Sequence, residues 1–203
     1  MIKNAVFDLG NVVISFDKPR IAAAFADGAE ERRFLIDKCL GSPEWSMLDL
    51  GEITAEEAAR RITLREGGRF RALTSRFFAD WYRADLTNAD VLALAAGLKA
   101  KGYRTFVLSN MQTAAADYFG SIGDFEPFDG VVISGYEHIK KPDPEIFRLL
   151  CRRYGIVPSE TLFIDDDDNG GNYAAASALG FLGRRVLPND VGDVRALLNE
   201  YGM

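Results

Sequence analysis

Residues 161–172 read TLFIDDDDNGGN, an apolar run that ends in four consecutive aspartates followed by Asn-Gly-Gly. The apolar part, residues 161–165, shows little alternation, which is typical of a strand buried on both faces of a parallel sheet. Ligands of such sheets bind beyond the carboxyl ends of the strands. Because four adjacent carboxylates would raise one another's pKa values, we expect a cation to bind among them.

Similar apolar runs occur elsewhere in the chain, at residues 4–9 (NAVFDL), 103–109 (YRTFVLS) and 129–134 (DGVVIS), with a weaker one at 181–187 (FLGRRVL). Helical patterns are found at residues 88–101, 143–154, 172–180 and 191–201. Strands that alternate with helices in this way predict an α/β fold, a Rossmann-like parallel sheet flanked by helices on both faces.

Residues 16–87 interrupt this alternation, because they contain no strand-like run and have a helical composition. Thr54, followed three residues later by Glu57, resembles a capping box that opens a helix through Ile62. We therefore predict an α/β core formed by residues 1–15 and 88–203, with residues 16–87 as a helical cap inserted after the first strand.

The composition is that of an ordinary soluble globular protein, with 48% hydrophobic and 27% charged residues among 203. A net charge of -6 disfavours non-specific binding to nucleic acid or membranes. We find no basic leader and no apolar run near 18 residues. Cys39 and Cys151 do not make a disulfide framework, which favours a reducing, cytoplasmic location. The single histidine, His138, argues against a His-rich metal site or a serine–histidine triad, and we expect it to be structural.

Polar side chains follow each of the first four strand-like runs. In chain order they are Asp8, the pair Ser109 and Asn110, the pair Lys140 and Lys141, and the pair Asp165 and Asp166. In a parallel sheet these groups converge on one edge. A nucleophilic carboxylate, a hydroxyl, an ammonium and a carboxylate pair together indicate a phosphoryl-transfer site that needs a hard cation.

The motifs FDLGNVV, VLSN, KKPDPEIF and FIDD occur in this order and resemble the four motifs of the haloacid dehalogenase superfamily of hydrolases. The match spans residues 6–180, and the helical insertion resembles that family's helical cap. The DLGNV form of the first motif most resembles a branch that includes bacterial glucose 1-phosphate phosphatases. The resemblance implies a Mg²⁺-dependent phosphatase acting on a small phosphorylated metabolite, with sugar 1-phosphates as candidate substrates.

The resemblance also implies a role for each motif residue. Asp8 is the expected nucleophile and takes the phosphoryl group as an aspartyl phosphate. Ser109 and the backbone N–H of Asn110 are expected to hold phosphate oxygens. Lys141 is expected to neutralise the phosphate and the carboxylates, with Lys140 as the alternative register.

The expected Mg²⁺ ligands are the Asp8 carboxylate, the Gly10 backbone carbonyl and the acidic pair. We expect Asp166 to bind the metal directly and Asp165 to act in the outer coordination sphere or as the partner of Lys141. Magnesium prefers six oxygen ligands and keeps several waters, so a few protein groups suffice.

Two positions depart from the family pattern. Many family phosphatases carry a general acid–base aspartate where this chain has Gly10, and such help is worth roughly 10²–10⁴-fold in rate. Low-pKa leaving groups, such as anomeric or phenolic oxygens, should therefore react faster than alkyl oxygens. The fourth motif is also two residues longer than usual. Asp167 or Asp168 is a candidate to reach the water that Gly10 cannot activate, although a solvated turn explains this loop more simply.

Two other functions remain open. Haloacid dehalogenases of this superfamily also lack the second aspartate, but they need no metal and typically lack the acidic pair, so Asp165 and Asp166 favour a phosphatase. A non-catalytic relative that binds a ligand through the same site is supported by Gly10 and the longer loop. Substrate choice is expected to lie in the cap, and its candidate contact residues, among which the sequence does not choose, are Trp45, Arg60, Arg61, Arg69 and Arg71.

Overall fold

The computed structural model describes residues 1–167, 169 and 171–203. In this part of the chain five strands form one parallel sheet in the order β3-β2-β1-β4-β5. The strands are β1 (Asn4–Phe7), β2 (Arg104–Ser109), β3 (Gly130–Ile133), β4 (Thr161–Asp165) and β5 (Leu182–Arg185). Each of the five predicted runs contains one of these strands, which confirms the α/β fold class.

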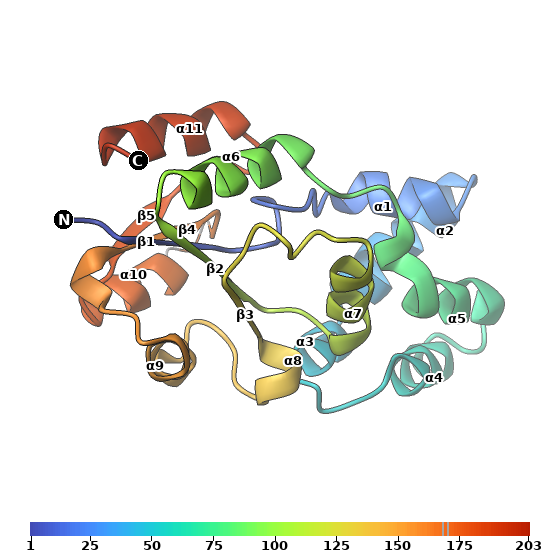
Figure 1. Ribbon diagram of the computed structural model, residues 1–203. Helices are drawn as coiled ribbons and strands as arrows, with labels where there is room; N and C mark the ends of the chain where they lie inside the picture. The colour runs from blue at the N-terminus through green and yellow to red at the C-terminus, as the bar shows by residue number, and fades with distance from the viewer. Residues whose placement is uncertain (168, 170) are drawn as a thin grey trace.

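Helices cover both faces of the sheet (Figure 1). One face carries α6 (Ala89–Ala100) and α11 (Val191–Glu200), and the other carries α9 (Pro144–Tyr154) and α10 (Gly171–Ala178). All four were predicted, with ends shifted by a residue or two. Two further helices, α7 (Thr113–Ser121) and α8 (Ser134–Glu137), follow β2 and β3 and were not predicted.

Alternate strand residues point to opposite faces, as the two-residue period of a strand requires. On the α9 and α10 side, Val6, Phe106 and Phe163 pack with Phe147. The rings of Phe147 and Phe163 meet edge to face at 5.3 Å between centroids. On the other side the buried strand residues include Ala5, Phe7, Val107, Leu162 and Ile164. Because both faces are buried, the strands carry apolar residues without alternation.

The segment between β1 and α6 is helical, as predicted. Its elements are α1 (Lys18–Phe25), α2 (Ala29–Phe34), a π-helix (Leu35–Leu40), α3 (Pro43–Asp49), α4 (Ala55–Arg65), α5 (Arg71–Asp80) and a 3₁₀ turn (Trp81–Arg83). The Thr54 hydroxyl caps α4 by accepting a hydrogen bond from the Glu57 N–H at 3.2 Å. The Glu57 carboxylate pairs instead with Arg60 and Arg61. Figure 1 shows these helices beyond the carboxyl ends of the strands.

The chain enters and leaves this insertion through two segments that lie side by side. The Ser15 N–H donates to the Leu86 carbonyl at 2.7 Å, and the Asn88 N–H donates to the Val13 carbonyl at 2.9 Å. The predicted boundaries after residues 15 and 87 fall at this pair of segments. The division into a core and a cap stays a prediction.

Among the described residues, every helix is too short or too polar to cross a bilayer. Cys39 and Cys151 are free thiols. Burial raises the pKa of Cys39 to about 12, so this thiol is an apolar core group rather than a nucleophile at neutral pH.

Candidate active site

The register of the sheet brings two of the predicted site residues together. Phe7 of β1 pairs with Ile164 of β4, and the Asp8 N–H donates to the Ile164 carbonyl at 2.9 Å. Asp8 and Asp165 therefore stand next to each other at the carboxyl ends of two adjacent central strands. The strand order reverses between β1 and β4, which is where open α/β sheets bind ligands.

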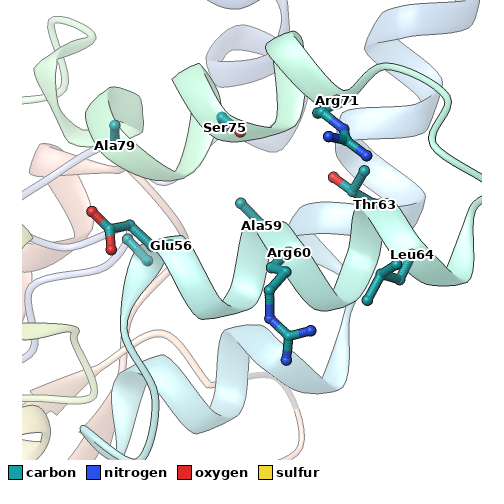
Figure 2. Close-up of a pocket in the computed structure, with 9 residues that line it drawn as sticks. Glu56, Ala59, Arg60, Thr63, Leu64, Arg71, Ser75 and Ala79 are labelled. Atoms are coloured by element: carbon teal, nitrogen blue, oxygen red, sulfur yellow. The ribbon is translucent and has the colours of Figure 1, made fainter.

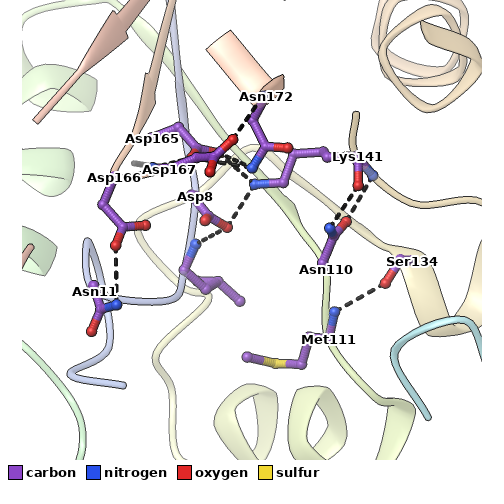
Figure 3. Close-up of polar contacts among 11 residues, drawn as sticks. Asp8, Asn11, Asn110, Met111, Ser134, Lys141, Asp165, Asp166, Asp167 and Asn172 are labelled. Atoms are coloured by element: carbon purple, nitrogen blue, oxygen red, sulfur yellow. Dashed lines mark hydrogen bonds and ion pairs between the residues drawn. The ribbon is translucent and has the colours of Figure 1, made fainter. Parts of the chain in front are cut away.

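Lys141 lies between these two carboxylates (Figure 3). Its Nζ is 2.9 Å from Asp8 Oδ1 and 2.7 Å from Asp165 Oδ2. The side chains of Lys141 and Asp165 are 1% and 0% exposed, whereas that of Asp8 is 13% exposed. Of the two carboxylates, Asp8 is therefore the one that an incoming molecule can reach.

The single ammonium of Lys141 does not neutralise all the carboxylates around it. Burial raises the pKa of Asp8 to about 7, with Lys141 opposing the shift and Asp165 and Asp166 adding to it. Burial disfavours the charged form of Asp165 as well, yet Lys141 holds the pKa of this group below its ordinary value. Burial also raises the pKa of Asp166. The ammonium thus keeps Asp165 ionised and leaves Asp8 and Asp166 short of positive charge.

A divalent cation fits this imbalance. Oxygen atoms of Asp8, Asp165 and Asp166 all lie within 4.8 Å of one another. Among the described residues these three carboxylates share the Lys141 ammonium, so two negative charges are left over when all are ionised. Carboxylate oxygens at such spacing are the ligands that Mg²⁺ prefers.

The two aspartates of the pair have different surroundings. Asp165 accepts hydrogen bonds from Lys141 Nζ, from Asn172 Nδ2 at 3.1 and 3.2 Å, and from the Asp167 N–H at 2.9 Å. The Asp166 carboxylate accepts one from Asn11 Nδ2 at 3.0 Å. Asp166 therefore keeps more lone pairs for a metal, in keeping with the predicted division of roles, which stays a prediction.

Ser109 ends β2 and is 1% exposed, and Asn110 follows it. The Asn110 side chain bonds the main chain of Lys141 in both directions, accepting from its N–H at 2.8 Å and donating to its carbonyl at 2.9 Å. This contact, which the sequence did not predict, positions the loop that carries Lys141. The phosphate-binding roles of Ser109 and Asn110 stay predictions.

The longer fourth loop is held by Asp167. Its two carboxylate oxygens accept the N–H groups of Asn169 and Asn172, each at 3.0 Å. This favours the simpler interpretation of a turn that leads into α10. Asp168, the other candidate for activating water, lies outside the described residues.

A cavity of about 160 Å³ opens beside Asp8. Core residues on its lining are Asp8, Gly10, Ile14, Ser109, Asn110 and Met111. The insertion contributes Phe16, Trp45, Asp49 and Trp81. The Trp45 and Trp81 rings are 4.9 Å apart between centroids, and the buried Trp81 Nε1 has no hydrogen-bond partner among the described residues. A polar edge and an aromatic wall thus enclose a space next to the exposed carboxylate.

Of the five candidate cap residues, Trp45 lines this cavity. Arg60 and Arg71 instead line another cavity, of about 300 Å³, between α4 and α5 (Figure 2). Arg61 and Arg69 form ion pairs with Glu57 and Glu30. The cavity between α4 and α5 contains none of the clustered carboxylates, so we place the chemistry beside Asp8.

Sequence reasoning assigned no role to Asp49, or to Asn11 and Asn172, whose side chains donate hydrogen bonds to Asp166 and Asp165. Asn172 had a signal, since counting back from Gly180 aligns it with an asparagine that the resemblance to the haloacid dehalogenase superfamily implies. Asn11 had no signal that decided its role; the structure gives it a left-handed backbone (φ 54°), which asparagine tolerates better than most residues. Asp49 had none, because it is one of many acidic residues on the insertion's helices.

Comparison with known proteins agrees with this geometry. A family model for haloacid dehalogenase-like hydrolases matches residues 2–180. The chain belongs to the haloacid dehalogenase-like hydrolases. Within this family it is 30% identical over 200 residues to a D-ribitol-5-phosphate phosphatase of Bacteroides thetaiotaomicron, covering 89% of this chain and 90% of the relative.

Solved haloacid dehalogenase-like structures share the fold. One from Bacteroides thetaiotaomicron, in complex with magnesium and inorganic phosphate, superposes with a TM-score of 0.71 at 23% identity, covering 94% of this chain and 96% of that one. The L-2-haloacid dehalogenase of Xanthobacter autotrophicus superposes with a TM-score of 0.66 at 20% identity, covering 100% and 84%. Because both kinds of enzyme have this fold, the fold alone does not choose between a phosphatase and a dehalogenase.

Proposed function

We propose that this protein is a Mg²⁺-dependent phosphatase that hydrolyses small phosphate monoesters through an aspartyl phosphate on Asp8. The observation that carries the proposal is the cluster of Asp8, Asp165 and Asp166 around the single ammonium of Lys141, beside a cavity. The 30% identical phosphatase relative supports the same activity.

Asp8, Asp166 and the Gly10 carbonyl would hold the metal, with Asp165 supporting Lys141. When bound, Mg²⁺ supplies positive charge to the phosphate oxygens and orients the phosphoryl group. Asp165, whose oxygens are taken up by Lys141, Asn172 and the Asp167 N–H, holds the ammonium in place.

The reaction proceeds in two displacements at phosphorus. A carboxylate oxygen of Asp8 attacks in line, and the ester oxygen leaves. Lys141, Ser109 and the Asn110 N–H stabilise the negative charge on the phosphoryl oxygens. Water then attacks the aspartyl phosphate and restores Asp8. The cap, residues 16–87, excludes bulk water and contacts the leaving group through its aromatic wall.

The substrate is a small phosphorylated metabolite. The aromatic wall of Phe16, Trp45 and Trp81 suits the apolar face of a ring, which supports a sugar 1-phosphate or an aryl phosphate. The Bacteroides relative is named for a sugar-alcohol phosphate with an alkyl leaving group. A panel of sugar 1-phosphates, aryl phosphates and sugar-alcohol phosphates therefore defines the preference.

A metal-independent dehalogenase is the second candidate, because the Xanthobacter dehalogenase shares the fold. The two are separated by assaying phosphate release from p-nitrophenyl phosphate with Mg²⁺ and with excess chelator, using Asp8→Asn as the blank. We expect activity that depends on Mg²⁺ and falls by roughly 10⁴-fold or more in the variant. Chloride release from a 2-haloacid in chelator, with no phosphatase activity, would overturn the proposal.

A further inference from the structure

Among the described residues, the carboxylates next to Asp8 already have other partners or an expected metal, so none of them replaces the aspartate that position 10 lacks. Asp165 binds Lys141 and Asn172, Asp166 accepts from Asn11, and Asp167 accepts two backbone N–H groups. Of the residues that the structure describes, a carboxylate in another part of the cavity is better placed to protonate the leaving oxygen.

Asp49, the last residue of α3, lines the same cavity as Asp8 and Ser109. None of the described residues donates a hydrogen bond to its carboxylate. Trp45 and Trp81 of the insertion line the cavity with it. Asp8 comes from the core and Asp49 from the insertion, so a phosphate ester whose phosphoryl group meets Asp8 would direct its leaving group toward the insertion side of the cavity.

Hydrogen bonds connect the C-terminal end of α3, beside Asp49, to the core. The Ser134 hydroxyl donates to the Asp49 carbonyl and accepts from the Met111 N–H at 3.0 Å. His138 Nδ1 lies 2.9 Å from the Leu50 carbonyl oxygen. These bonds tie the backbone of Asp49 and its neighbour to the loops that follow β2 and β3.

The close packing of this junction requires a glycine. A Cβ on Gly51 would lie 2.3 Å from the Gly135 carbonyl oxygen, and the φ of Gly51 is +67°. In addition, Lys140 Nζ donates to the Ser46 hydroxyl of α3. The backbone that carries Asp49 is therefore held in place, while its carboxylate, with no donor among the described residues, is available for proton transfer.

We propose that Asp49 is the general acid and base of the reaction, supplied by the insertion in place of the aspartate missing at position 10. This inference rests on the proposed phosphatase function. In the first step Asp8 bonds to phosphorus, the bond from phosphorus to the ester oxygen breaks, and the Asp49 proton goes to that oxygen. In the second step water bonds to phosphorus, its proton goes to Asp49, and the bond to Asp8 breaks to release phosphate.

The surroundings of Asp49 favour its protonated form near neutral pH. Burial raises the pKa of this group to about 8, with Lys140 opposing the shift and Asp8 adding to it. Most charged side chains on the elements packed against α3 are paired with other groups, namely Arg60 and Arg61 with Glu57, Arg65 with Glu44, Lys38 with Glu66, Asp37 with Arg33 and Glu137 with Arg153. Glu56 of α4 lines the separate cavity between α4 and α5. Because the acid form is the active one in the first step, kcat/KM should fall as the pH rises through about 8.

The test uses the isosteric variant Asp49→Asn and substrates that differ in how much their leaving group needs a proton. With Mg²⁺, we expect kcat/KM for an alkyl phosphate such as ribitol 5-phosphate to fall by roughly 10²-fold or more. The kcat/KM for p-nitrophenyl phosphate should change little, because p-nitrophenolate leaves without a proton. Its kcat should still fall, with a burst of one p-nitrophenol per enzyme, because water attack on the aspartyl phosphate also loses its base.

Two further variants sharpen the test. Glu52→Gln makes the same kind of change at an exposed carboxylate three residues away, and should leave all rates unchanged. Adding Gly10→Asp to Asp49→Asn should restore alkyl phosphate hydrolysis, because a Cβ on Gly10 would meet only Phe16 Cβ, at 4.0 Å. The alkaline fall in kcat/KM for the alkyl phosphate should be absent in Asp49→Asn.

An equal loss for both substrate classes, or no loss for the alkyl phosphate, would overturn the role of Asp49 and leave the phosphatase function standing. A wild-type protein that hydrolyses neither class with Mg²⁺ would overturn both.

Discussion

The two walls of the cavity beside Asp8 are built in different ways. The core wall carries Asp8, Ser109 and Asn110 at strand ends, where the hydrogen-bond register fixes their spacing. The wall from the insertion is aromatic apart from Asp49, and the packing of helices positions it. The phosphoryl group, common to all substrates, would meet the first wall, and the leaving group the second. Binding of the phosphoryl group would therefore depend mainly on the core wall, whereas recognition and protonation of the leaving group would depend on the insertion wall.

The largest effect is expected on the core wall, from Lys141→Met. The buried carboxylates of Asp8 and Asp165 would lose their ammonium, and breaking a buried pair in this way typically costs about 3–5 kcal/mol of unfolding free energy. Urea denaturation without metal measures this loss, and phosphatase activity should disappear with it. Saturating Mg²⁺ should recover part of the stability, since the cation also neutralises these carboxylates.

Lys140→Met is the matched control for this prediction, because Lys140 is adjacent and only partly buried. Its loss should lower stability far less. A larger effect at Lys140 than at Lys141 would mean that the lysine next to the nucleophile has been assigned to the wrong register.

A smaller effect on the same wall is expected from Asp166→Asn. If Asp166 binds the metal directly, the Mg²⁺ concentration for half-maximal activity should rise by roughly 10-fold or more. Titration of activity with Mg²⁺ measures this. Asp167→Asn provides the control, because its carboxylate serves the turn before α10, and both its Mg²⁺ dependence and its rate of aspartyl phosphate hydrolysis should stay near wild type. Slower hydrolysis of the aspartyl phosphate in Asp167→Asn would instead support a role for Asp167 in activating water.

The smallest effect is expected on the insertion wall, from Trp45→Leu. Aromatic stacking is worth about 0.5–1.5 kcal/mol, so kcat/KM for ring-containing substrates should fall by roughly 2- to 12-fold. Inhibition by inorganic phosphate, which contacts the core wall, should not change. Phe70→Leu, which alters an aromatic residue of the insertion packed against Phe34 rather than the cavity, is the control. Loss of phosphate inhibition in Trp45→Leu would show that the two walls are not independent.

The same contrast explains what could be predicted from the sequence. Runs such as residues 161–165 identify strands because a strand buried on both faces must be continuously apolar, and the residue after each run then falls at the ligand-binding edge. The order of the motifs predicted that Asp8, Lys141 and Asp165 belong to one site. In the structure the Lys141 ammonium contacts both carboxylates.

The insertion wall could not be predicted in this way. Which face of α3 meets the cavity depends on contacts between residues far apart in the chain, such as Ser134 with the Asp49 carbonyl. The strand order was likewise not predicted, because pairing partners such as Phe7 and Ile164 carry no local sequence signal. Single polar contacts, such as Asn110 with the Lys141 main chain, depend on loop geometry that a pattern of residue types does not contain.

The paired segments at residues 13–15 and 86–88 have a consequence for how such proteins diversify. Since the chain departs from and returns to almost the same point, everything between can lengthen, shorten or be exchanged while the strand ladder that holds the nucleophile keeps its alignment. Closing a longer excursion costs little, because the entropic penalty grows only with the logarithm of its length. A new selectivity can therefore be acquired by replacing one continuous stretch of the gene, provided that the new stretch again supplies an acid where Asp49 stands.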